Sequence, residues 1–150
     1  MKQVISKTIM LVAMAATFLS FTNSGGEGFE IYLNNKVVIQ QFGPKLDATQ
    51  RLKLNPHSAN DLLTIKYHHC GRVGKNRVIT IKDLQNKTVK EWRFADAATP
   101  VAAMNCNVKD ILNLGTKKDT EFKLYYASSE LPGGRLLTTL VIDNNVYASK

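Results

Sequence analysis

The sequence LTIKYHHCGRVGKNRVITI, residues 63–81, decides the fold class of this chain. Its two ends alternate apolar with polar residues, which is the period-two pattern of a half-buried β-strand. Its middle, residues 71–77, is a basic turn that contains two glycines. The stretch therefore predicts two strands joined by a turn. It also holds two of the three histidines and one of the two cysteines, so candidate chemistry gathers here.

The same alternation recurs along the rest of the chain. Asn34 and Asn35 tolerate positive φ and predict a hairpin turn, residues 130–135 predict another turn, and residues 109–114 predict either one helical turn or a bend. No segment has a convincing helical period. We expect an all-β fold, a single antiparallel β-sandwich of about eight or nine short strands, immunoglobulin-like or related. Besides the two strands above, strands are expected at residues 29–33, 36–42, 51–54, 88–94, 103–108, 121–127 and 136–142.

The first 24 residues have the layout of a secretory signal peptide. Lys2 and Lys7 precede an apolar run of about 14 residues, and small polar residues follow it. That run is too short to cross a bilayer as a helix, which takes about 20 residues. We therefore expect cleavage near Gly25, one domain over residues 25–150, no transmembrane segment in the mature chain, and a periplasmic or secreted product.

The chain is basic. Its formal net charge is +8, and without Lys2 and Lys7 the mature part keeps 18 basic and 12 acidic residues, a net charge of +6. Such a surface attracts anionic glycans, lipopolysaccharide or acidic proteins at short range. Nucleic acid is not expected as the natural partner of an exported protein. The 44% hydrophobic and 21% charged residues are ordinary for a globular protein and favour neither a disordered nor a fibrous chain.

Export also predicts the state of the two cysteines. Oxidising compartments let thiols pair, and Cys70 and Cys106 have only each other. A disulfide between them would close a loop of about 35 residues and stabilise the fold by about 3–4 kcal/mol. The alternative is two buried free thiols.

Arg72, Lys75 and Arg77 make the turn a candidate anion site. Backbone amides that are accessible at glycines can, together with basic side chains, bind a carboxylate, sulfate or phosphate group. The turn is not a phosphate-binding loop of the nucleotide-binding kind, because His69 and Asn76 stand where that motif needs glycine and a hydroxyl residue. The alternative is a solvated turn whose charges keep sheet edges from aggregating.

His68, His69 and Cys70 suggest a second class of function, the handling of copper or zinc. On a strand, His68 and Cys70 share one face and His69 lies on the other. Zinc sites take three or four protein ligands, no second cluster supplies the remainder, and a disulfide would remove the thiolate. Two histidines at a strand end, one solvated and one packed, are the simpler interpretation.

Catalysis has little support in the sequence. No Gly-x-Ser-x-Gly elbow occurs, and scattered acidic residues do not indicate the paired carboxylates of a glycosidase. We therefore expect neither an enzyme nor a cofactor. Tyr32 and Tyr125 alternate with Ile31 and Leu124, so they are the candidates for an exposed aromatic platform that stacks on sugar rings.

The chain resembles uncharacterised small exported β-sandwich proteins of the Bacteroidota. The resemblance lies in FEIYLN (29–34), YHHCGR (67–72), GKNR (74–77), EWRFAD (91–96) and ELPGGRL (130–136). It implies a periplasmic or secreted β-sandwich and brings no activity with it. We expect a non-catalytic binding or structural module of the cell envelope, whose partner is an envelope protein, a glycan or an anionic ligand.

Overall fold

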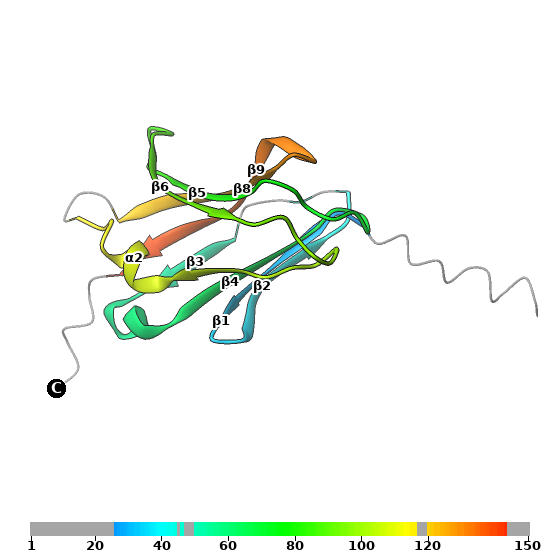
Figure 1. Cartoon of the computed structure of the whole chain (residues 1–150). Helices are drawn as coiled ribbons and strands as arrows, with labels where there is room; N and C mark the ends of the chain where they lie inside the picture. The colour runs from blue at the N-terminus through cyan, green and yellow to red at the C-terminus, as the bar shows by residue number, and fades with distance from the viewer. Residues whose placement is uncertain (1–25, 45, 47–49, 117–119, 144–150) are drawn as a thin grey trace, which may run out of the picture.

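The structure, a computed structural model, describes residues 26–44, 46, 50–116 and 120–143. These residues form two β-sheets that face each other as layers (Figure 1). Sheet A has the strand order β2-β1-β4-β7, and sheet B has the order β3-β9-β8-β5-β6. The predicted all-β sandwich is confirmed. The predicted signal peptide, residues 1–24, lies outside the described residues.

The described part of the chain consists of short elements. No helix in the described ranges is long and apolar enough to cross a membrane. Residues 109–114, for which the sequence left a helical turn or a bend open, contribute to the short helix α2. The elements are β1 (Gly28–Leu33), β2 (Lys36–Phe42), β3 (Arg51–Leu54), η2 (Pro56–Asn60), β4 (Leu62–His68), β5 (Arg77–Lys82), β6 (Thr88–Phe94), β7 (Met104–Asn107), α2 (Val108–Leu112), β8 (Glu121–Ser128) and β9 (Leu131–Ile142).

The division of strands between the two sheets matches the immunoglobulin pattern in part. β4 pairs with β7 in sheet A, whereas β5, β6, β8 and β9 lie together in sheet B, and immunoglobulin domains divide their consecutive strands in this way. One pair departs from the expected antiparallel arrangement, because β3 runs parallel to β9. Hairpins produce antiparallel neighbours, but β3 reaches β9 after the chain has left β2 in the other sheet, so no hairpin dictates its direction.

The turns between strands agree with the sequence in two places and differ in a third. Asn34 and Asn35 join β1 to β2 with φ of 49° and 66°, and β5 and β6 form the second expected hairpin. The turn predicted at residues 130–135 is wrong, since β9 already begins at Leu131. A positive φ of 67° at Gly134 and a register shift opposite Ala127 let this glycine-rich segment pair with β8.

β4 shows how alternation in the sequence places side chains. Leu63, Ile65 and Tyr67 point into the sandwich and are at most 3% exposed, while Lys66 and His68 lie on the outer face and are partly exposed. His69, just after the strand, is again buried. The prediction that His68 and His69 lie on opposite faces is therefore confirmed, and the apolar faces of both sheets meet in one core.

The predicted disulfide is wrong, because Cys70 and Cys106 are both free. Cys106 lies on β7 opposite Leu63 near the start of β4, whereas Cys70 follows the other end of β4. Five residues of strand, at about 3.3 Å each, place Leu63 roughly 17 Å from His68 at the other end of β4, next to which Cys70 lies. A disulfide tolerates only about 7 Å between Cα atoms. Strand direction therefore keeps the two thiols apart.

We predict that the two thiols differ in reactivity. Under native conditions at mildly alkaline pH, a thiol reagent should modify Cys70, which is exposed, and spare Cys106, which is buried. Burial also raises the pKa of the Cys106 thiol to about 12. Denaturant should release the second thiol in a titration without reductant, and a Cys70→Ser variant should react only in denaturant. A wild-type protein that shows no thiol in denaturant would contradict this assignment.

Candidate functional site

A cluster of aromatic and polar side chains joins the two sheets where β4 ends. The rings of Tyr67 on β4 and Tyr126 on β8 stack with centroids 4.4 Å apart and an angle of 19° between planes. The His69 ring lies 4.7 Å from the Tyr67 ring, and its Nε2 atom is 2.8 Å from Tyr126 Oη. Ser128 Oγ is 3.3 Å from the same nitrogen. All four residues are at most 5% exposed, so this is an interior cluster.

Glu27 and Arg135, whose side chains are 33% and 27% exposed, border the interior cluster. Tyr67 donates its hydroxyl hydrogen to Glu27 Oε1 at 2.5 Å, and Arg135 Nη2 donates to Glu27 Oε2 at 3.1 Å. Burial, followed by the hydrogen bond to Glu27, raises the pKa of Tyr67. Burial lowers the pKa of His69. Both groups are therefore held in their neutral forms, in which they serve as hydrogen-bond partners inside the protein.

The space beside the interior cluster does not admit a ligand. A hollow of about 180 Å³, which includes its opening to solvent, is lined by Tyr67, His69, Arg77, Met104 and Tyr126 among others, and it is too narrow to hold a water molecule. Shifted pKa values often mark active sites. Here they follow from tight packing of side chains that bond to one another.

The structure separates the three residues of the predicted anion site. Arg77 is only 7% exposed. Its Nε and Nη2 atoms donate to the carbonyl oxygen of Ala95 at 3.0 and 2.9 Å, and Nη1 donates to that of Ala102 at 2.9 Å. Arg72 and Lys75 are exposed. Arg77 therefore anchors the loop before β7, and the expectation that it shares a surface with the other two is corrected.

Carboxylates of the protein already occupy the amides of the basic turn. The Lys75 amide donates to Glu130 Oε2 at 2.9 Å, and the Asn76 amide donates to Asp96 Oδ1 at 2.8 Å. The bond from the Lys75 amide lowers the pKa of Glu130. Backbone amides are what an anion-binding turn offers its ligand. Anion binding at this turn stays a prediction that rests on the Arg72 and Lys75 side chains, next to two negative charges.

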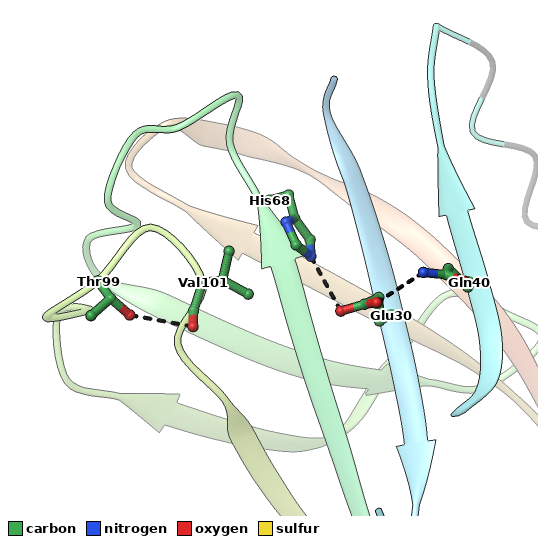
Figure 2. Close-up of polar contacts among 5 residues, drawn as sticks. All are labelled: Glu30, Gln40, His68, Thr99 and Val101. Atoms are coloured by element: carbon green, nitrogen blue, oxygen red, sulfur yellow. Dashed lines mark hydrogen bonds and ion pairs between the residues drawn. The ribbon is translucent and has the colours of Figure 1, made fainter. Parts of the chain in front are cut away.

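His68, His69 and Cys70 do not form a common ligand set. His68 stands on the outer face of sheet A (Figure 2), His69 is buried, and Cys70 begins the turn with a positive φ of 53°. Across the described ranges, no group of three or more His, Cys, Asp or Glu side chains is arranged to hold one metal ion. Alternation along the strand separates the two histidines, which leaves the metal-handling alternative without a structural site there.

The outer face of sheet A carries aromatic and polar side chains in register. Cross-strand pairing aligns residues of β2, β1 and β4 in three rows, which together we call the sheet A face. The rows are Phe42, Gly28 and His68; Gln40, Glu30 and Lys66; and Val37, Tyr32 and Thr64. The face thus has an aromatic ring in each outer row and a polar row between them.

Gly28 lets the Phe42 ring lie across the sheet. A Cβ atom at Gly28 would lie 2.2 Å from Phe42 Cδ1 and 2.6 Å from the carbonyl oxygen of Gln41. The Phe42 ring instead covers the glycine, as aromatic residues do beside glycines in sheets, and meets His68 edge on with centroids 4.9 Å apart. Phe42 remains 47% exposed, so this ring presents an apolar surface to solvent.

Figure 2 shows the polar contacts of the middle row. Gln40 Nε2 donates to Glu30 Oε1 at 2.9 Å, and Glu30 Oε2 lies 3.4 Å from His68 Nε2. The Glu30 carboxylate therefore orients a side chain on each neighbouring strand.

The predicted aromatic platform is divided between the two sheets. Tyr32 lies in the sheet A face, with Lys66 Nζ 4.7 Å from its ring centroid. Tyr125 lies on β8 in sheet B, with Lys82 Nζ 4.8 Å from its ring. Both lie opposite the core, as expected, but they cannot act together. Sequence reasoning missed Phe42, Glu30 and Gln40, because their grouping depends on strand register.

Comparison with known proteins adds no family assignment. No protein-family model matches the chain, and no curated protein matches it either.

We predict that Arg77 is structural and Arg72 is not. Arg77→Gln should lower the free energy of unfolding by about 2–4 kcal/mol, because it removes the charge-assisted hydrogen bonds to the carbonyls of Ala95 and Ala102. Arg72→Gln, at an exposed position, should change it by less than about 0.5 kcal/mol. Denaturant unfolding of both variants gives the comparison. Equal, small effects would show that Arg77 does not hold the loop.

We also predict that Gly28 is required for the sheet A face. Gly28→Ala should cost about 1–3 kcal/mol of stability, because the new methyl group displaces the Phe42 ring or the β2 backbone. Gly133→Ala is the control, since nothing lies within 4 Å of a Cβ atom there, and it should be nearly neutral. Thermal or denaturant unfolding measures both, and equal stability of the two variants would refute the predicted clash.

Proposed function

We propose that the protein is an exported, non-catalytic binding module of the cell envelope that binds through the sheet A face. The observation that carries the proposal is a contrast in exposure. Phe42 and Val37 of the sheet A face are 47% and 44% exposed, whereas Tyr67, His69 and Tyr126 are at most 4% exposed. Aromatic surface beside a few oriented polar groups is the usual composition of a binding site.

The interior cluster supports a non-catalytic role. A general base must reach the proton that it takes from a substrate, but His69 is buried and its Nε2 atom already contacts Tyr126 and Ser128. Ser128 is 5% exposed. These groups stabilise the join between the sheets, so the proposal assigns them no part in binding.

The proposal that the protein is exported is supported by the first 24 residues, which have a basic start, an apolar run and a small polar end. A binding module delivered to the periplasm or cell surface meets envelope polymers and proteins first. The basic turn contributes less to the proposal than the sheet A face, because Glu130 and Asp96 already accept bonds from its amides.

Fractionation of cells that make the full chain, followed by binding of the purified mature protein to isolated envelopes, tests the proposal. We expect a mature protein that has lost about the first 24 residues and that the envelopes retain. Changing Phe42→Ala together with Gln40→Ala should weaken retention about tenfold or more, since exposed aromatic anchors dominate binding energy.

The matched control changes the other candidate surface. Arg72→Gln with Lys75→Gln should leave envelope retention within a factor of about two, which is less than 0.5 kcal/mol. Loss of retention in the basic-turn variant alone would move the binding surface to the turn and overturn the proposal. An uncleaved protein found in the cytoplasm would overturn export.

A further inference from the structure

We infer that the ligand of the sheet A face is an uncharged glycan chain. The inference rests on the proposed function and names the class of ligand. It follows from the order of groups across the face, with an aromatic ring in each outer row and hydrogen-bonding side chains in the row between them.

The two rings suit sugar rings in a chain. A sugar presents one face of C–H groups, which packs on an aromatic ring, and a rim of hydroxyl groups. Phe42 offers such a ring at 47% exposure. Tyr32, two rows away, is partly exposed and has the Lys66 ammonium group over its ring, so a sugar would stack there in place of that group. Four residues of β1 separate the rows of Gly28 and Tyr32, roughly 13 Å at 3.3–3.4 Å per residue. One sugar unit does not span both rings, so the face fits an oligosaccharide.

The middle row supplies partners for hydroxyl groups. Hydroxyls both donate and accept hydrogen bonds, and the row contains an amide that does both and a carboxylate that accepts. Glu30 has about four lone-pair sites, and its contacts with Gln40, His68 and Tyr32 leave capacity to accept one bond from a sugar hydroxyl. Since Glu30 also holds both neighbours in place, the polar groups are oriented before the ligand arrives, which reduces the entropy lost on binding.

The charge of the face favours an uncharged ligand. The full chain carries a net charge of +8, but the middle row sets the negative Glu30 against the positive Lys66. A carboxylate at the centre of the face repels sulfated or carboxylated glycans, and the Lys66 ammonium group is engaged over the Tyr32 ring. Glu30 and Lys66 thus cancel within the middle row, which adds no net positive charge to attract an anionic ligand.

The composition also disfavours a protein partner. Protein interfaces bury about 800 Å² on each side, and their centres are depleted of Lys and Glu. Here Glu30 and Lys66 occupy the middle row, and they separate the exposed apolar residues Phe42 and Val37. A ligand rich in hydroxyl groups meets this alternation of apolar and polar rows better than an apolar protein surface does.

The test is binding of the purified mature protein to soluble polysaccharides, measured by affinity electrophoresis and calorimetry. The uncharged probes are β-glucan, xylan and mannan, and the anionic probes are heparin and polygalacturonate. At physiological salt, we expect binding to at least one uncharged probe. Phe42→Ala should weaken that binding about tenfold or more, and Gln40→Ala about three- to tenfold.

Leu84→Ala is the matched control, because Leu84 is 53% exposed and lies outside the sheet A face. It should bind as the wild type does. Gln40 is also exposed, so its variant keeps the test valid if Phe42→Ala fails to fold. Binding only to anionic probes, binding that neither sheet A variant weakens, or no binding to any uncharged probe overturns the inference.

The outcomes also separate this inference from the proposed function. If envelopes retain the protein in a manner that depends on Phe42 and Gln40 while no uncharged glycan binds, the glycan inference fails and the proposed function stands. If the variants leave envelope retention unchanged, both fail.

Discussion

The stack of Tyr67 on Tyr126 is the contact on which the rest of the structure depends. It joins the two sheets through β4 and β8, whereas in antibody domains a disulfide links the sheets and here both thiols are free. Buried tyrosines need partners for their hydroxyl groups, and Glu27 and His69 supply them. These hydrogen bonds engage the ring hydroxyls and the imidazole with one another, so the account places ligand binding on the surface.

Strand β4 contributes residues both to the contact between the two sheets and to the proposed binding face. Tyr67 points inward from β4, while Lys66 and His68 point outward. Glu30 on β1 holds His68 and Gln40 from its central strand, and Gly28 leaves room for the Phe42 ring. A rigid sheet thus presents preorganised groups, which is how a flat surface gains affinity without a deep pocket.

The alternation of apolar and polar residues and the turn residues predicted those features that depend on one strand or one turn at a time. Alternation gave the sandwich and the opposite faces of His68 and His69, and Asn34 with Asn35 gave the first hairpin. Strand order and register lie beyond such patterns, so the cysteine pairing failed and the rows around Glu30 went unseen. Arg77 is different, because it shares the inward face of β5 with Ile79 and Ile81. That alternation predicts its burial from the sequence, although its charge drew attention to the surface.

The central claim is that the ligand binds to the sheet A face and does not contact the interior cluster. The most direct test is NMR of the histidine rings during titration with an uncharged polysaccharide. The account predicts that the His68 resonances shift, and that those of buried His69 and of His57, which is exposed on η2, stay in place. Shifts at His69 with His68 unchanged would contradict it.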